Sequence, residues 1–170
     1  MGFLDSKIKT LENGKQVLEL PDSVNFIILT NDYNVIMGRQ WRACCNAETT
    51  NLFGGYLDGN ETYLEALKRE LKEETNLELS DFTLETIYSN KRVSAGTTTE
   101  RNSLFILISK ENASQILKKM KCNDIEEGIS FKAMKLDNDL FEEMQTDTVE
   151  GLRSFIALTT CFLLMINEVV

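Results

Sequence analysis

The stretch from Gly55 to Leu77, GYLDGNETYLEALKRELKEETNL, is the main basis for the fold that we expect of this chain. Its segment TYLE has the form of a capping box, in which Thr62 accepts a hydrogen bond from a backbone N–H of the first turn and Glu65 reaches back. The residues that follow are rich in Leu, Glu, Lys and Ala, which are strong helix formers. The stretch therefore predicts a helix that begins after Thr62.

The predicted helix has an apolar stripe and a defined end. Leu64, Leu67 and Leu71 recur at helical spacing, so we expect all three to face a hydrophobic core. Past its last turn a helix often needs a residue in the left-handed conformation, which Asn adopts more readily than most residues. Asn76 is therefore expected to end the helix.

Three glutamates lie on an adjoining face of the same helix. Glu70, Glu73 and Glu74 stand at positions i, i+3 and i+4, so their carboxylates are close enough to repel one another. A divalent cation would relieve that repulsion, and ligands that are all oxygen favour Mg²⁺, or Mn²⁺ as a substitute, over zinc. The alternative is a solvated acidic face on which Arg69 and nearby lysines form local ion pairs.

The whole stretch follows the pattern G-x5-E-x7-R-E-U-x-E-E-x-G-U, where U is apolar, except that Asn76 replaces the usual glycine near its end. The matching residues are Gly55, Glu61, Arg69, Glu70, Leu71, Glu73, Glu74 and Leu77. This resembles the Nudix box, the signature of hydrolases that cleave nucleoside diphosphates linked to another moiety. The resemblance implies an α/β (α+β) fold, namely a Nudix-type α/β/α sandwich with a mixed central β-sheet.

The resemblance also implies a role for each residue of the motif. Metal-activated water would attack one phosphorus of a pyrophosphate, with Mg²⁺ neutralising the charge that develops on the phosphoryl oxygens. The implied metal ligands are Gly54, through its carbonyl, and Glu70, Glu73 and Glu74, of which Glu73 and Glu74 would also take part in catalysis. The residues expected to brace the motif are Gly55, Glu61 and Arg69.

A second segment, SAGTTTER from Ser94 to Arg101, resembles a loop of the ADP-ribose pyrophosphatases, a Nudix subfamily in which a loop glutamate assists catalysis. Glu100 holds that position and is the expected catalytic carboxylate outside the box. Ala95 stands where the subfamily has a proline. The alternative for Glu100 is a surface glutamate paired with Arg101.

A third segment, Gln40-Trp41-Arg42, resembles the Q-x-R of the same subfamily, whose arginine helps to bind the diphosphate or ribose of the substrate. Arg42 is therefore the leading cation for the substrate's diphosphate. Trp41 and Phe53 are candidates for stacking on a base, and Trp41 is equally compatible with a core position.

Composition bounds the remaining classes. A chain of 170 residues with 42% apolar residues suits one globular domain with its own core. The net charge of −9 argues against a nucleic-acid-binding surface, and the absence of His excludes His-based triads and zinc sites with His ligands. Four cysteines without C-x-x-C spacing, and no secretory leader pattern, favour reduced thiols in a cytoplasmic protein.

The rest of the chain alternates apolar β-rich runs with short helical patterns. We expect one Nudix domain over residues 1–170, with an N-terminal strand and turn segment at 1–22, the box at 55–77 and an apolar C-terminal helix at 147–170. The expected strands are 15–20, 23–30, 35–42, 82–93, 103–109 and 129–136; further helices are expected at 113–121 and 137–144, and 43–51 is expected to be irregular.

The C-terminal run FIALTTCFLLMI carries no charge and is bracketed by Glu150, Arg153 and Glu168. It is shorter than the roughly 20 apolar residues that a bilayer-spanning helix needs. We expect this helix to be buried in its own core or in a homodimer contact rather than to associate with a membrane.

These expectations converge on a Mg²⁺-dependent enzyme. The favoured substrate is ADP-ribose or a related nucleoside diphosphate sugar, cleaved at its pyrophosphate bond to a nucleoside monophosphate and a sugar phosphate. Within the same family, hydrolysis of nucleoside triphosphates or dinucleoside polyphosphates is an alternative. A regulatory module that binds such a nucleotide without hydrolysing it is an alternative from a different class.

Overall fold

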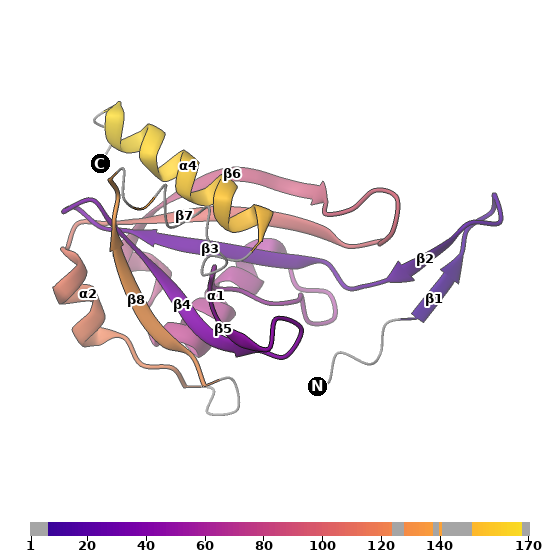
Figure 1. Ribbon diagram of the computed structural model, residues 1–170, viewed down its shortest axis with the longest axis horizontal. Coiled ribbons are helices and arrows are strands. Elements are labelled where there is room, and N and C mark those ends of the chain that lie inside the picture. Colours follow the sequence, from indigo (N-terminus) through magenta and orange to yellow (C-terminus); the bar gives the residue numbers. More distant parts are fainter. Residues whose placement is uncertain (1–6, 124–127, 138–139, 141–150, 168–170) are drawn as a thin grey trace.

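The computed structural model describes residues 7–123, 128–137, 140 and 151–167 (Figure 1). Its elements, in chain order, are β1 (Lys7–Thr10), β2 (Gln16–Glu19), β3 (Ser23–Leu29), β4 (Asn34–Arg42), β5 (Ala47–Asn51), α1 (Tyr63–Thr75), the 3₁₀ turn η2 (Leu79–Asp81), β6 (Phe82–Arg92), β7 (Arg101–Ser109), α2 (Ala113–Lys119), β8 (Ser130–Lys135) and α4 (Leu152–Ile166). Of the helix expected at 137–144, residues 137 and 140 alone fall within the described residues, and the rest lies outside them.

Six strands form one mixed sheet in the order β5-β4-β3-β7-β6, with β8 pairing with β4. Strands β3 and β7 run parallel, with Phe26 opposite Phe105, and the other pairs in the sheet are antiparallel. A mixed sheet with helices confirms the expected α+β class. Strands β1 and β2 form a separate hairpin that projects from this body in Figure 1.

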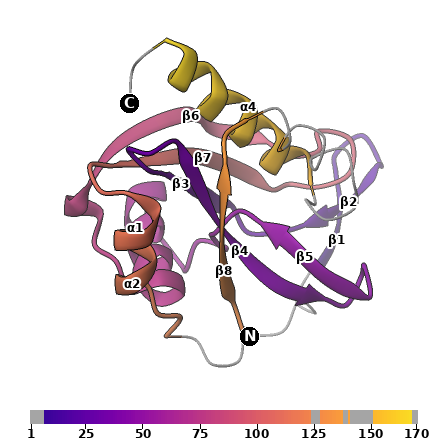
Figure 2. The same cartoon turned by 60° about the vertical axis from the view of Figure 1, so that its left-hand side comes forward.

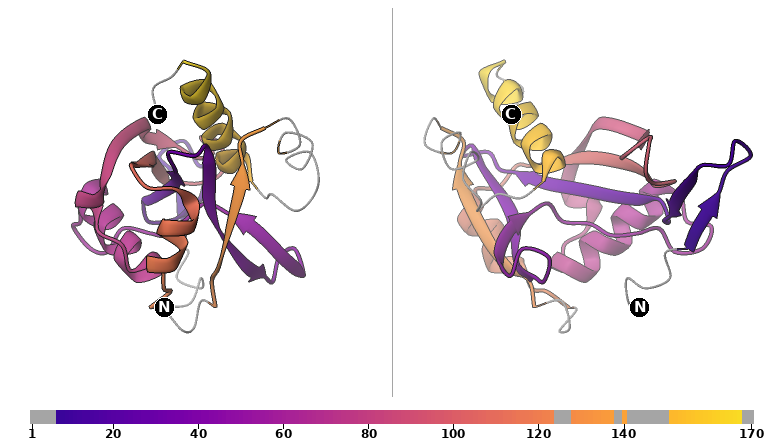
Figure 3. Two further views of the ribbon diagram at one scale, coloured as in Figure 1. Left: turned by 90° about the vertical axis from the view of Figure 1, so that its left-hand side faces the viewer. Right: turned by 45° about the vertical axis from the view of Figure 1, so that its right-hand side comes forward.

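The sheet separates two hydrophobic layers, with α1 and α2 on one face and α4 on the other (Figures 2 and 3). Because side chains alternate along a strand, Phe26 and Ile28 of β3 pack with the α1 layer, while Ile27 and Leu29 pack with the α4 layer. All four side chains are fully buried. The fold is therefore the α/β/α sandwich expected for the sequence.

Helix α1 begins and ends as predicted. Thr62 accepts a hydrogen bond from the Glu65 N–H at 3.3 Å, and the Glu65 carboxylate accepts one from the Thr62 N–H at 2.8 Å. The chain leaves the helix at Asn76, which has the left-handed angles φ 60° and ψ 15°. The capping box and the left-handed terminator are both confirmed.

The buried face of α1 differs from the predicted leucine stripe. Leu67 and Leu71 are fully buried, but Leu64 is 43% exposed, so its assignment to the core was wrong. Leu64 lies in the first helical turn, and the buried face continues instead through Glu70 and Glu74 toward the C-terminal end of the helix. The face that meets the protein interior is thus part apolar and part acidic.

The segment 43–51 is more regular than expected. Its second half is β5, which pairs antiparallel with β4 from Gly38 opposite Asn51 to Arg42 opposite Ala47. Asn46, with φ 51°, completes the turn between the two strands. The loop that follows also pairs with the sheet, because Phe53 and Phe26 exchange backbone hydrogen bonds of 3.0 and 2.9 Å.

Helix α4 buries one side only. Its buried residues are Ser154, Ala157, Leu158 and Cys161, of which the last three pack in the layer that contains Ile27 and Leu29. Its exposed apolar side chains are Leu152, Phe155, Leu163 and Ile166. The prediction of a core helix is therefore confirmed for one face of α4.

Candidate active site

Two carboxylates on the buried face of α1 lie directly against a glycine pair in the loop after β5. The Gly54 N–H donates a hydrogen bond of 2.7 Å to Oε2 of Glu74. A Cβ atom added to Gly55 would overlap Oε1 of Glu70. Glu70 and Glu74 are only 9% and 6% exposed. The glycines are thus required because the helix carboxylates approach the loop backbone closely.

Gly54 also has a backbone conformation that other residues rarely adopt. Its φ is 129°, and a Cβ atom at this position would overlap the carbonyl oxygen of Val24 in β3. The loop is therefore pressed between the sheet on one side and the Glu74 carboxylate on the other. This packing fixes the position of Glu70 and Glu74 relative to loop 52–55.

Arg69 holds the acidic residues of the motif together. Its Nε lies 2.9 Å from Glu61 Oε1, and its Nη1 lies 2.7 Å from Glu70 and 3.0 Å from Glu73. Its Nη2 donates to the carbonyl of Tyr56 at 2.8 Å. The hydrogen bond from Arg69 lowers the pKa of Glu61, and the same contacts raise the pKa of the guanidinium. This geometry suits the bracing role expected for Glu61 and Arg69.

The three glutamates are not assembled into a metal cluster. Across the described ranges, no group of three or more His, Cys, Asp or Glu side chains is arranged to hold a metal ion. The reason is visible in the contacts: Arg69 bonds to Glu70 and Glu73, Glu73 is exposed, and Glu74 turns toward Gly54. The donors nevertheless fit a divalent ion in kind, because Glu70 and Glu74 are buried oxygen ligands one helical turn apart.

Glu100 is buried and not paired with its neighbour in sequence. Its side chain accepts hydrogen bonds at Oε1 from Ser23 Oγ at 2.6 Å and from Arg153 Nη2 at 3.0 Å. Arg101 instead donates to the backbone carbonyl of Asn90 at 3.0 Å. The alternative of a surface glutamate paired with Arg101 is therefore wrong, since Glu100 is 5% exposed and its cation comes from α4.

A cavity of about 570 Å³ lies between the first turn of α4 and the sheet. Its charged lining residues are Arg42, Lys91, Arg92 and Arg153, and within the described part of the chain no Asp or Glu lines it. Gly54 also lines this cavity, so the residue that bonds to Glu74 forms part of the cavity wall. Loop 52–55 therefore connects the acidic face of α1 with a cationic cavity.

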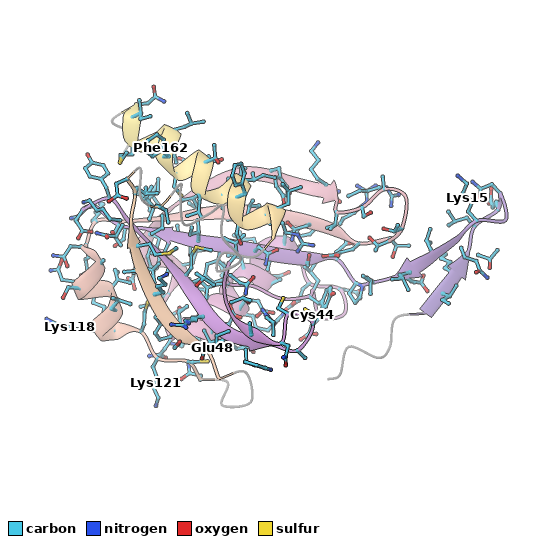
Figure 4. All side chains as sticks on the ribbon, viewed as in Figure 1. Lys15, Cys44, Glu48, Lys118, Lys121 and Phe162 are labelled. Carbon is cyan, nitrogen blue, oxygen red and sulfur yellow. The ribbon has the colours of Figure 1, made fainter. Side chains whose placement is uncertain are left out.

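The structure brings Arg42 to this cavity but not the two aromatic candidates. Phe53 is 1% exposed and stacks on Phe26 with ring centroids 5.3 Å apart, so its proposed stacking on a base was wrong. Trp41 is 57% exposed, which also excludes the core position considered for it. It lies opposite Glu48, which is labelled in Figure 4, and it is not among the residues that line the cavity.

Sequence reasoning missed Arg153 and Lys91 as site residues. In the sequence Arg153 is one of the charges that bracket the apolar C-terminal run, and Lys91 lies in a strand with no motif around it. Arg92, also in β6, lines the same cavity. A buried glutamate needs a cationic partner, but the burial of Glu100 is known only from the structure, so no sequence signal pointed to Arg153.

None of the helices within the described ranges combines the length and apolar character needed to cross a bilayer. No curated protein sequence matches the chain significantly. Among solved structures, an ADP compounds hydrolase has a TM-score of 0.64 at 16% identity, covering 95% of this chain and 85% of that one. The protein DR0079 from Deinococcus radiodurans has a TM-score of 0.60 at 17% identity, covering 91% of this chain and 98% of that one.

These structural likenesses, at such low identity, show a shared fold. The family model of the NUDIX domain matches residues 19–147, which include the box, the loop that carries Glu100 and the strands of the sheet. The resemblance seen in the box is thereby confirmed. The chain belongs to the NUDIX family and is a Nudix pyrophosphohydrolase.

Proposed function

We propose that this protein hydrolyses the pyrophosphate bond of ADP-ribose or a related nucleoside diphosphate sugar, giving a nucleoside monophosphate and a sugar phosphate. The family acts on nucleoside diphosphates linked to another moiety, and the segments around Arg42 and Glu100 resemble those of ADP-ribose pyrophosphatases. The name of one structural neighbour, ADP compounds hydrolase, agrees with this substrate class.

One observation carries the proposal. Gly54 lines the cationic cavity and at the same time bonds to the buried carboxylate of Glu74. A diphosphate is a compact polyanion, so the cavity cations can bind it while the carboxylates of α1 remain beside it. The chain as a whole has a net charge of −9, so the four cations of the cavity contrast with the acidic character of the whole chain.

The proposed cofactor is Mg²⁺, with Mn²⁺ as a substitute. Glu70 and Glu74 would hold it, with Glu73 and the Gly54 carbonyl as the further proposed ligands. When bound, a divalent ion lowers the pKa of a coordinated water and neutralises charge on the phosphoryl oxygens. Members of this family generally depend on divalent metals, which fits the all-oxygen donor set of the box.

The chain's own residues divide the remaining work. Arg69 holds Glu70 and Glu73 in place through contacts of 2.7 and 3.0 Å, so the carboxylates are oriented before any ligand enters. Arg42, at the cavity wall, is proposed to bind the diphosphate. Glu100 is proposed to accept a proton from the attacking water, and its carboxylate lies next to the cavity residue Arg153.

A turnover screen tests this function. ADP-ribose, other nucleotide sugars, dinucleoside polyphosphates and nucleoside triphosphates are each incubated with the protein and Mg²⁺, and released products are quantified. We expect Glu74→Gln to lower turnover by about 100-fold or more, the scale for losing a group that stabilises the transition state. Glu78→Gln is the matched control, because Glu78 is an exposed glutamate whose Oε1 forms an ion pair of 2.8 Å with Nζ of the exposed Lys72. Unchanged turnover in Glu74→Gln would contradict the proposed role.

The four cations of the cavity also favour a second candidate. Longer polyphosphate chains carry more charge than a diphosphate, so nucleoside triphosphates or dinucleoside polyphosphates remain the rival substrates. The screen separates them by relative kcat/KM. Binding of a nucleotide without turnover of any substrate would instead indicate a regulatory module.

A homodimer is also proposed, formed through the exposed side of α4. Leu152, Phe155 and Ile166 on that side are 75%, 47% and 58% exposed. Adjacent apolar side chains exposed in this way are typical of interaction surfaces. Sedimentation velocity would show a dimer if this proposal holds, and a monomer at all concentrations would refute it.

A further inference from the structure

One side chain, Arg153, joins the C-terminal helix α4 to the cavity. Arg153 enters the cavity from the first turn of α4. Its Nη2 lies 3.0 Å from Glu100 Oε1 and its Nη1 lies 2.8 Å from Asn25 Oδ1. The guanidinium is therefore held across one side of the cavity by a buried anion and a neutral amide.

The ion pair between Arg153 and Glu100 is formed by one N–H donor of the guanidinium and one carboxylate oxygen. A guanidinium has five N–H donors in a planar fork, and it binds most strongly when two of them meet two oxygens of one anion. Here Glu100 receives Arg153 through a single oxygen, Oε1, and the same oxygen also accepts from Ser23 at 2.6 Å. The contact is thus one-point and shared, which leaves room for a better anionic partner.

The exposed fractions of Arg153 and Glu100 indicate that a phosphate would reach Arg153 from the cavity. The side chain of Arg153 is 32% exposed, whereas that of Glu100 is 7% exposed. Arg153 therefore faces the cavity and Glu100 lies behind it. Arg42, Lys91 and Arg92 line the same cavity, so a polyanion is attracted into the space in front of Arg153.

We propose that Arg153 is a phosphate-binding residue of the substrate site, which binds phosphate oxygens of the substrate from the α4 side and releases Glu100 when it does so. This inference rests on the proposed function, because it places the diphosphate in the cavity. It makes the C-terminal helix part of the substrate site. It also links substrate binding to Glu100, which loses its cation when the phosphate takes the guanidinium and keeps its bond to Ser23.

Two variants of this pair should shift nucleotide affinity in opposite directions. Arg153→Gln removes the charge that binds phosphate, and we expect the Kd for ADP to rise by about 10- to 100-fold, the scale of a charge-assisted hydrogen bond. Glu100→Gln removes the anion that competes for Arg153, so the Kd for ADP should fall. A purely structural ion pair predicts weaker binding, or no change, in both variants.

The measurement is calorimetric titration of the full chain with ADP, and with adenosine as a probe that lacks phosphate, at one fixed Mg²⁺ concentration. Arg39→Gln is the matched control, because Arg39 forms an exposed ion pair with Glu48 and does not line the cavity. We expect it to leave ADP affinity unchanged. Arg153→Gln should leave adenosine affinity unchanged, since no phosphate is involved.

Arg153→Lys keeps the charge but not the fork, and we expect an ADP affinity between those of wild type and Arg153→Gln. This variant and Glu100→Gln decide the question if Arg153→Gln fails to give the wild-type circular dichroism spectrum. Equal ADP affinity in wild type, Arg153→Lys and Glu100→Gln would overturn the inference, as would absence of ADP binding by the wild type.

Failure of the inference and failure of the proposed function give different results. If ADP affinities shift as expected but no nucleotide sugar or polyphosphate is hydrolysed, the proposed activity fails and Arg153 remains a phosphate-binding residue. If ADP-ribose is hydrolysed while the Arg153 and Glu100 variants bind ADP like wild type, the activity stands and the inference fails.

Discussion

Replacing Arg69 with Gln should destabilise the fold much more than replacing an exposed arginine. The change leaves Glu61 and Glu70, with side chains 22% and 11% exposed, without the cation that contacts both. Breaking a buried ion pair costs about 3–5 kcal/mol, and an exposed pair contributes about 0–1 kcal/mol. The side chain of Arg69 is 24% exposed, between these limits, so we expect a loss of about 2–3 kcal/mol.

For a chain of 170 residues, 1 kcal/mol shifts the unfolding midpoint by about 2–4 °C, so Arg69→Gln should lower Tm by about 5–10 °C. The assay is thermal unfolding followed by circular dichroism, with EDTA and without nucleotide, so that ligand binding does not contribute to Tm. Arg39→Gln is the control, because Arg39 and Glu48 are 51% and 53% exposed.

A double-mutant cycle separates the ion pair from other effects of the substitution. Once Arg69 is replaced, Glu61→Gln should cost less than it does alone, since the carboxylate has already lost its cationic partner. A Tm for Arg69→Gln no lower than that of the Arg39 control would mean that these carboxylates do not depend on the guanidinium for their contribution to stability.

Three further outcomes follow from burial and pKa. Leu67→Ala should lower the urea-derived free energy of unfolding by about 2–5 kcal/mol, whereas Leu64→Ala in the exposed first turn should change it little; equal losses would contradict the observed burial. The hydrogen bond from Arg69 holds the pKa of Glu61 below its ordinary 4.5, so this stabilisation is present above pH 4.5 and is lost as pH falls through the folded-state pKa. Glu61→Gln should therefore reduce the fall in the free energy of unfolding between neutral and acid pH. An unchanged fall in that variant would contradict this prediction. Burial raises the pKa of Cys161 to about 12, so alkylation at neutral pH should modify this thiol only after unfolding, as mass spectrometry of peptides would show; rapid labelling of the folded chain would contradict it.

The sequence predicted the features of α1 that depend on hydrogen bonds between residues a few positions apart. The capping box of α1 and its end at Asn76 depend on residues a few positions apart, and both were predicted from the sequence. Strand β5 was missed because its residues, AETTN, show little apolar alternation. It forms through the hydrogen bonds that β4 offers from Gly38 to Arg42, which are a property of the assembled sheet.

The same distinction applies to the site. The glutamates of the box could be placed on one helix from their spacing, but whether they converge depends on Arg69, whose side chain bonds to two of them. The partner of Glu100 is 53 residues away in the chain, on α4, and no local pattern connects the two. Phe53 was misassigned because its position after β5 does not indicate that its ring packs against Phe26 until the sheet is known.

We propose that the buried carboxylates of Glu70 and Glu74 hold the divalent ion that acts on a diphosphate in the adjoining cavity. Anomalous diffraction from crystals grown with Mn²⁺ and ADP tests it most directly. We expect a manganese peak shared by Glu70 and Glu74 beside Gly54, with the ADP diphosphate in the cavity lined by Arg42 and Arg153. Manganese bound elsewhere, or a diphosphate outside that cavity, would contradict it.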